Sequence, residues 1–352
     1  MKNFTNFLEL SVLIPCYNAE QTIDRLMNSI MVQKYPSEYL RIIVTNDGST
    51  DNTLAKLKDW QGKFGAKVMT IIDQKNQGLA ESRNILTAAV KTKWFTFIDS
   101  DDYYEKKAFI NFSKSSDNES VDVIVSKTYR KKGGEKVSWW LTNWMTTSLK
   151  RYVGNNLFFT WNKVYNTTFF RGIGFRWVKG NDMLEDQAFF AALGPKIRRL
   201  GVCRHYTYNF VWSKNSMSSV IDFKKNESKF KQMLANLDSS LNIMLVGRTY
   251  KQLSKIERKV LTSVVYNFVM QIFLTYIIFP AYYGFPKKDQ DELNRIFYNE
   301  KRQLVTETLT KYGVKIYPPF GWWRKFTYYV LRLRSRYNPN KFKCYIVKKD
   351  QE

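Results

Sequence analysis

The chain has 352 residues, which suffice for one large domain or two ordinary ones, and its apolar fraction of 44% can build a packed core. Its 56 lysines and arginines exceed its 31 aspartates and glutamates by a formal net charge of +25, which indicates an anionic partner, either nucleic acid or an anionic membrane surface. A single histidine excludes a His-rich metal site. The three cysteines are far apart, which excludes a metal or redox cysteine spacing and a disulfide framework and favours a reducing compartment.

The first hundred residues alternate between strand-like and helix-like patterns. Apolar, β-branched runs predict strands, and segments of roughly 10–15 residues with helical apolar spacing separate them. This alternation predicts βαβ units, and therefore an α/β fold with a mostly parallel sheet and flanking helices. The predicted strands are 10–14, 40–45, 68–72 and 94–98, and the predicted helices are 20–32, 50–60 and 79–90.

The pattern changes in the second half of the chain. Strand patterns recur at 121–126 and 203–212, and long helical patterns rich in lysine and arginine follow from about Asp222. We therefore expect an α/β domain over residues 1–221, with two parts that meet near residue 102. A helical, basic region is expected over residues 222–352.

One stretch within the basic region, residues 260–286, contains no charged side chain and is long enough to span a bilayer. Polar residues recur through it, and Pro280 and Gly284 interrupt its end. These features favour a buried or interfacial helix over a membrane-spanning one, and the sequence leaves all three alternatives open.

The most informative motif is Asp99-Ser100-Asp101-Asp102, at the end of the apolar strand 94–98. Clustered carboxylates repel one another unless a cation neutralises them, and Mg²⁺ or Mn²⁺ typically joins a few carboxylates to substrate phosphates. Ligands of open α/β sheets bind outside the carboxyl ends of the strands. The motif therefore predicts a divalent cation and a phosphate-bearing ligand here. An acidic turn that caps the next helix is the alternative.

Other polar residues are expected near the same edge of the sheet. Asp47 ends the second strand before Gly48, where it is either a ligand-binding carboxylate or a turn residue. Arg83 lies one turn into the third helix, and Glu185 and Asp186 begin a later apolar helix. The paired acids fit general-base chemistry, and they also fit a helix N-terminus that favours negative charge.

Four segments in this order resemble the family 2 glycosyltransferases, which have the GT-A fold. They are S-V-L-I-P-C-Y-N-A-E (11–20), I-I-V-T-N-D-G-S-T-D-N-T (42–53), N-Q-G-L-A-E-S-R-N (76–84) and F-I-D-S-D-D (97–102). The resemblance covers about residues 10–215. It implies transfer from a nucleotide-diphosphate sugar, with UDP as the expected nucleotide, a divalent cation and inversion at the anomeric carbon.

The resemblance also implies roles on the donor side. Asp47 matches the aspartate that accepts the uracil imide N–H, and Arg83 matches an arginine that contacts the nucleotide. Asp99 and Asp101 match the D-x-D pair, with Asp101 as the direct metal ligand and Asp99 facing the ribose or the metal. The remaining nucleotide-side candidates are Pro15, Tyr17 and Glu20, the last of which is also explained as a solvated first-turn glutamate.

On the acceptor side, Asp186 matches the position of the catalytic base, and Glu185 would orient it or bind the acceptor. Asn162 and Lys163 belong to a segment that resembles the N-K-x-Y stretch near the acceptor cleft. The rings of Trp161 and Trp177 could stack on sugars, with core packing as the equal alternative. His205 is a further candidate metal ligand, since some relatives carry a metal-binding histidine after the base. A basic loop at Lys214–Ser218 could contact the diphosphate.

Residues 311–349 contain no acidic side chain, and tryptophans and tyrosines lie between their lysines and arginines. This composition suits a membrane interface with anionic headgroups. We expect a cytoplasmic enzyme attached to the inner face of the cell membrane, acting on a glycan or lipid-linked acceptor. A basic helix that packs on the catalytic domain is the alternative. Nucleic acid is a less favoured partner, and the oligomeric state cannot be read.

Three other classes compete with the glycosyltransferase hypothesis. A sugar nucleotidyltransferase would also use carboxylates and a metal, but usually has a glycine-rich phosphate loop near its N-terminus, and this chain has none there. A nucleic-acid-binding protein is supported only by the net charge. A dinucleotide oxidoreductase is disfavoured because no G-x-G-x-x-G follows the first strand.

Overall fold

The computed structural model describes most of the first 211 residues and parts of the remainder. The described residues are 6–116, 121–132, 135–138, 159–180, 182, 185–211, 226–248, 250–255, 257–258, 260–262, 265, 287–296 and 302–312.

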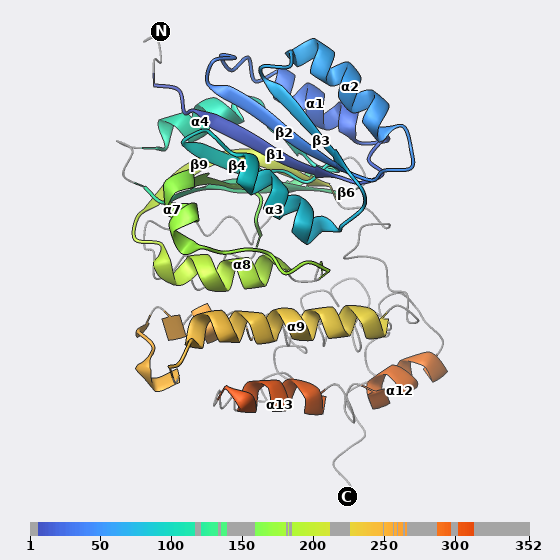
Figure 1. Cartoon of the computed structure of the whole chain (residues 1–352), viewed down its shortest axis with the longest axis vertical. Helices are drawn as coiled ribbons and strands as arrows, with labels where there is room; N and C mark the ends of the chain where they lie inside the picture. Colours follow the sequence, from blue (N-terminus) through green and yellow to red (C-terminus); the bar gives the residue numbers. More distant parts are fainter. Residues whose placement is uncertain are drawn as a thin grey trace, which may run out of the picture.

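A single mixed sheet of nine strands forms the centre of the molecule (Figure 1). Its order is β3-β2-β1-β4-β8-β6-β9-β5, and β7 pairs with β6 off this path. The strands are β1 (Leu10–Cys16), β2 (Leu40–Asp47), β3 (Met69–Gln74), β4 (Trp94–Phe97), β5 (Tyr103–Tyr104), β6 (Val123–Lys132), β7 (Glu135–Ser138), β8 (Lys163–Asn166) and β9 (Leu200–Val211). The first four strands pair in parallel, which confirms the predicted α/β architecture.

Helices cover both faces of this sheet. One buried cluster joins it to α1 (Ile23–Met31), α2 (Thr53–Phe64) and α4 (Ala108–Lys114). A second buried cluster joins its other face to α3 (Leu79–Ala89), α7 (Thr167–Ile173) and α8 (Glu185–Leu193). Because both faces are covered, β1 and β4 are buried throughout and mostly apolar, as parallel strands usually are.

The register sets the ends of the parallel strands side by side. Cys16 of β1 pairs with Asn46 of β2, and Asp47 pairs with Gln74 of β3. Phe97 of β4 pairs with Leu13, so Asp99 follows β4 at about the level at which β1 ends. The polar residues that follow these strands are therefore gathered at one edge, as the sequence predicts.

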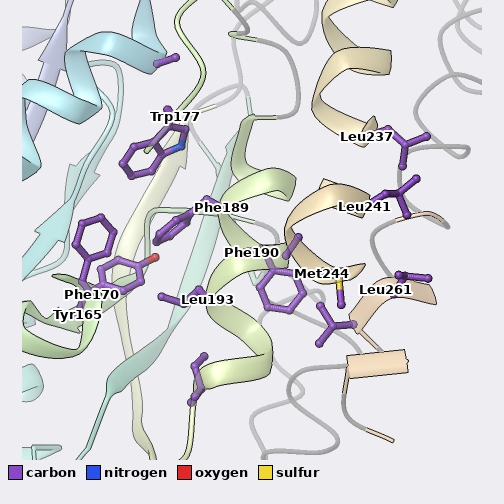
Figure 2. Packing of buried hydrophobic residues seen from close by; sticks show 14 of the residues in the cluster. Tyr165, Phe170, Trp177, Phe189, Phe190, Leu193, Leu237, Leu241, Met244 and Leu261 are labelled. Carbon is purple, nitrogen blue, oxygen red and sulfur yellow. The ribbon is translucent and has the colours of Figure 1, made fainter. Parts of the chain in front are cut away.

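Two of the described C-terminal helices, α9 (Asn226–Leu245) and α13 (Arg302–Lys311), lie behind α8, on the side away from the sheet (Figure 1). Phe190 of α8 lies toward Met244 of α9, and both belong to one buried cluster (Figure 2). The cluster also includes Val305 of α13. These helices therefore share a hydrophobic core with the sheet. The other C-terminal elements are η3 (Tyr250–Gln252) and α12 (Lys287–Ile296).

Several sequence predictions lie outside the described residues. They are the boundary at 221/222, the loop Lys214–Ser218 and almost all of the basic segment after Lys311. At the start of the uncharged stretch, the described positions Val260, Leu261 and Val265 are buried in the core. Among the helices that the structure describes, none is long and apolar enough to span a bilayer.

Candidate functional site

The centre of the site is Arg83, a buried arginine on α3 that faces three carboxylates. One of its terminal nitrogens donates to Glu185 Oε1 at 2.5 Å and to Asp186 Oδ1 at 3.0 Å. Its other terminal nitrogen lies 3.7 Å from Asp99 Oδ1. The arginine side chain is only 2% exposed. One cation thus joins the start of α8 to the acidic turn after β4.

The charges in this cluster do not balance, since one cation faces three potential anions. Burial, followed by the neighbouring charge of Asp186, raises the pKa of Glu185 to about 8. Burial also raises the pKa of Asp99 to about 7, although the nearby Arg83 opposes the shift. The acids in turn hold the pKa of Arg83 above its ordinary value, against the effect of its burial. The cluster therefore favours binding a proton or a second cation.

Further hydrogen bonds hold the segment before α8 against α3. Asn84 and Trp177 form two reciprocal hydrogen bonds. The side-chain amide of Asn84 donates to the backbone carbonyl of Trp177 and accepts from the backbone N–H of Trp177, both at 2.9 Å. Asp182 Oδ1 accepts from the N–H of Ala80 in the first turn of α3, at 2.8 Å. Gly78 precedes that turn at φ +89°, and a Cβ there would lie 2.6 Å from Asp182 Oδ2. This close contact explains why glycine occupies position 78.

Asp47 is buried at the end of β2 and organises the loop that leads into α3. Its carboxylate accepts three hydrogen bonds, from the Gln74 amide at 2.7 Å, from the N–H of Gln77 at 2.8 Å and from the N–H of Gly78 at 2.9 Å. A carboxylate has roughly four acceptor positions, so the capacity for one further donor remains. Asp47 is thus a structural residue of the loop that can also accept a ligand N–H.

The three aspartates after β4 have different surroundings. Asp102 is fully buried and accepts from the Tyr208 hydroxyl at 2.6 Å and from the N–H of Val211 at 2.7 Å, so it fastens the turn to β9. Asp101 is partly exposed, and burial raises its pKa. Arg25 donates to the Asp101 backbone carbonyl, which leaves the Asp101 carboxylate unused by this contact. Asp102 thus fastens the turn, and Asp99 and Asp101 are its two candidates for ligand binding.

Asp99 and Asp101 fit the coordination habits of Mg²⁺ or Mn²⁺, which bind through one or two carboxylates and complete their shell with phosphates and water. Their raised pKa values show that a nearby positive charge would be favourable. Among the described residues, no group of three or more histidine, cysteine, aspartate or glutamate side chains could hold a metal by itself.

The remaining donor-side candidates lie beside β1. Pro15 is in β1 and pairs with Thr45. Tyr17 follows the strand and is 52% exposed. Glu20 accepts from the backbone N–H of Asn52 at 2.8 Å and from the Gln21 amide at 3.0 Å, so its carboxylate supports the N-terminus of α2. This contact is a structural role that the sequence pattern did not indicate.

The tryptophan predictions need correction. Trp161 is 3% exposed and is stacked with Phe159 and Tyr208. Trp177 is also 3% exposed and packs edge-on against Phe97 within the core. Neither ring presents a face to a sugar, so both residues belong to the hydrophobic core.

Asn162 and Lys163 are buried as well. The Lys163 ammonium donates to the Phe159 carbonyl at 2.7 Å and to Asn162 Oδ1 at 2.8 Å, and burial lowers its pKa to about 7. Asn162 has φ +56°, and its amide donates to the Ser126 carbonyl at 3.1 Å. Both residues brace the chain between β6 and β8, and direct contact with an acceptor would be inconsistent with their burial.

His205 also differs from its prediction as a metal ligand. It is exposed on β9, where the pairing with β6 is irregular, between the pairs Ser126–Cys203 and Lys127–Tyr206. The acidic turn contacts β9 at Tyr208 and Val211, which follow His205 by three and six residues, about 10 and 20 Å along a strand. The structure therefore does not bring His205 to Asp101.

Sequence reasoning missed the roles of Asn84, Asp182 and Tyr208, each of which positions another residue of the site. Asn84 and Tyr208 lie in segments whose motifs were recognised, but no pattern indicated their partners, because these are roughly a hundred positions away in the chain. For Asp182 the only signal was its place shortly before the acidic pair.

Comparison with known sequences identifies the family. Residues 11–180, just under half of the chain, match the model of glycosyl transferase family 2, so this segment carries a domain of that family. The match confirms both the predicted family and the predicted enzyme class. It also covers all four of the donor-side motifs.

Three relatives illustrate the range of similarity. The Staphylococcus aureus poly(ribitol-phosphate) β-N-acetylglucosaminyltransferase TarS is 30% identical over 120 residues, which are 34% of this chain and 21% of TarS. An uncharacterised glycosyltransferase of Haemophilus influenzae is 28% identical over 75% of this chain and 86% of its own length. A processive diacylglycerol β-glycosyltransferase of Mycoplasma pneumoniae is 28% identical over 54% of this chain and 60% of its own.

The fold is also similar to that of TarS. The crystal structure of TarS residues 1–349 in complex with UDP-GlcNAc superposes with a TM-score of 0.54 at 18% identity, and covers 84% of this chain and 91% of that one. This similarity confirms the predicted GT-A fold. In sequence, however, the chain matches only about a fifth of the full length of TarS.

The buried acids make stability depend on pH. The pKa of Glu185 rises from an ordinary 4.5 to about 8 in the folded chain, so the neutral form contributes stability that is complete below pH 4.5 and is lost as pH rises to 8. We expect the free energy of unfolding to fall over this window, by at most about 1.4 kcal/mol per pH unit for this group. The substitution Glu185→Gln keeps an acceptor for Arg83 and should flatten the fall.

Chemical denaturation at a series of pH values measures this effect. Glu38→Gln, at an exposed position, is the matched control and should reproduce the wild-type profile. Some slope should remain in Glu185→Gln because the pKa of Asp99 is also raised, to about 7. A Glu185→Gln profile identical to that of the wild type would contradict the assignment of a buried, proton-binding glutamate.

Proposed function

We propose that this chain is an inverting glycosyltransferase that moves a sugar from a UDP-sugar to a hydroxyl of a glycan or lipid-linked acceptor in surface polysaccharide synthesis. The observation that carries the proposal is the Arg83 cluster. It places Asp186, the candidate base, on the same guanidinium that faces Asp99 at the donor edge. A transferase needs its base and its donor site side by side, because the acceptor hydroxyl must reach the anomeric carbon.

UDP is the favoured nucleotide for two reasons. Asp47 retains capacity to accept one N–H, as the imide of uracil would supply, at the end of a parallel strand. A protein of similar fold has been crystallised with UDP-GlcNAc and with UDP. Tyr17 is exposed beside this edge and is available to cover a base. Which sugar is transferred does not follow from these residues.

A divalent cation, Mn²⁺ or Mg²⁺, would be held by Asp101 and Asp99. When bound, it would act as a Lewis acid that stabilises the negative charge growing on the departing diphosphate. The protein would contribute the carboxylates of Asp99 and Asp101, which lie at the level of the strand ends. Asp102, fastened to Tyr208 and Val211, holds the turn in this geometry.

Asp186 is the better base of the acidic pair. Its side chain is 18% exposed against 11% for Glu185, and the pKa of Glu185 near 8 keeps that group protonated at neutral pH. Asp186 would take the proton of the acceptor hydroxyl as the oxygen bonds to the anomeric carbon and the nucleoside diphosphate departs from the opposite face. Displacement from opposite faces inverts the anomeric configuration. Glu185 and Arg83 would fix the position of Asp186.

The cellular location of the enzyme is inferred from the kind of acceptor that it would use. Relatives include an enzyme named for diacylglycerol and one named for poly(ribitol-phosphate), so lipid and polymer acceptors are both represented. The acid-free, aromatic segment 311–349 suits attachment to an anionic membrane. We infer a cytoplasmic enzyme bound to the inner face of the cell membrane.

Donor binding is tested by thermal unfolding with UDP, in the presence and absence of Mn²⁺. A ligand that binds only the folded state raises the unfolding midpoint, by several degrees at roughly a hundred times its Kd. We expect a UDP shift that Mn²⁺ enlarges, and Asp101→Asn should lose the part that depends on Mn²⁺. The exposed Asp59→Asn serves as the matched control. A full Mn²⁺ response in Asp101→Asn would refute the metal assignment.

The base is tested by measuring sugar transfer and UDP binding in the same Asp186→Asn protein. The amide preserves the shape of the side chain but cannot take a proton, so transfer should fall by about 10²–10⁴-fold. The UDP-dependent thermal shift should persist, since the fold and the donor edge are retained. If transfer stays near the wild-type rate, another group is the base.

A further inference from the structure

We propose that the sheet edge beside Asp101 carries a binding strip for a phosphate-bearing, non-aromatic polymer, which the enzyme holds as its acceptor strand. The proposal rests on the proposed transferase function and names the chemical class of the acceptor. The strip is built from cations and tyrosines of α1, β5, β6 and β9. Its members are Arg25, Tyr103, Lys127, Tyr129, Lys131 and Tyr206.

The strip begins directly at the acidic turn. Arg25 donates to the Asp101 carbonyl, and its guanidinium carbon lies 5.3 Å from the centroid of the Tyr103 ring. The Lys131 ammonium lies at the same distance, 5.3 Å, from that centroid. Lys131 pairs with Val211, whose N–H is bonded to Asp102. Two cations on one tyrosine therefore flank the candidate metal turn.

From there the strip continues along β6 and β9, away from the turn. Lys127, Tyr129 and Lys131 alternate along β6 and so share one face of the strand. Tyr129 stacks on Tyr206 of β9, with ring centroids 3.9 Å apart and planes within 8°, and the Lys127 ammonium lies 5.5 Å from the Tyr206 centroid. Lys127 and Lys131 are separated by about 13 Å of strand. This length exceeds what the diphosphate of one donor would need.

The packing of the rings decides which polyanion fits. Cations lie over the rings of Tyr103 and Tyr206, and Tyr206 is also stacked on Tyr129. The strip therefore presents positive charges held in place by aromatic rings, and these ring faces are already in contact with other side chains. Single-stranded nucleic acid gains much of its binding energy from base stacking on aromatic rings. A polymer of phosphates and hydroxyls needs only the charges, and is the better match.

A membrane surface is also a poorer match for this strip. Interfacial insertion requires exposed apolar side chains, and none of the six strip residues is among the large hydrophobic residues that the structure describes as exposed, which include Val32, Val178 and Val246. The chain's net charge of +25 would attract a polyanion over longer distances, and the strip would set its register at the site.

Direct binding of a fluorescent, synthetic polyol-phosphate oligomer to the full chain tests the proposal without requiring transfer. We expect salt-sensitive binding that Lys127→Ala/Lys131→Ala weakens by about tenfold at low salt. Lys127→Arg/Lys131→Arg should restore most of it. The matched control is Lys58→Ala/Lys67→Ala, which removes the same charge from exposed positions near β3, at the opposite edge of the sheet.

An equal loss in the two alanine variants would overturn the proposal, because it would show that only net charge matters. Tighter binding to anionic phosphatidylglycerol vesicles or to a single-stranded oligonucleotide than to the oligomer would also overturn it. The UDP-dependent thermal shift is measured on the same proteins. If no protein responds to UDP, the proposed function fails. If all proteins respond to UDP and oligomer binding is unchanged by the Lys127 and Lys131 substitutions, the binding strip is refuted and the proposed function stands.

Discussion

The site depends on one buried cation and on the acids that surround it. Removing a guanidinium from water costs several kcal/mol unless hydrogen-bonded or charged partners offset it. Here Glu185 and Asp186 accept its hydrogen bonds and Asp99 lies nearby, and these partners come from two distant parts of the chain. If α8 moved away from α3, Arg83 would lose these partners. The interaction therefore stabilises the packing of α8 against α3. The candidate base and the candidate donor edge are held together by the same interaction.

The parallel sheet supplies the other constraint. Parallel strands end at a common edge, so Asp47 and Asp99 lie at the same edge of the sheet although β1 separates their strands. The antiparallel strand β8 and the long strand β9 extend this edge, and Asp102 ties the acidic turn to β9 through Tyr208. Behind α8, the helix α9 completes the core, so the described C-terminal helices support the base helix from its far side.

Much of this could be predicted from local sequence. Alternating strand and helix periodicity predicts the parallel half, and the residues after each strand must then meet at one edge. The partners of Arg83 could not be predicted, because Glu185 lies about a hundred positions away and contact depends on how α8 packs. Trp161 and Trp177 show a second limit, since a sugar platform and a core residue have the same composition. His205 shows a third, because the sequence pattern does not give the position along β9 at which the acidic turn makes contact, and that position is at Tyr208 and Val211.

A double-mutant cycle between Arg83 and Asp186 tests the central claim most directly. The free energies of unfolding of Arg83→Gln, Asp186→Asn, the double variant and the wild type are measured at neutral pH and low salt. The account predicts a coupling energy of at least about 1 kcal/mol, because each single change leaves a buried partner unpaired. Additive single effects, with a coupling energy near zero, would contradict the claim that this ion pair joins the base helix to the donor edge.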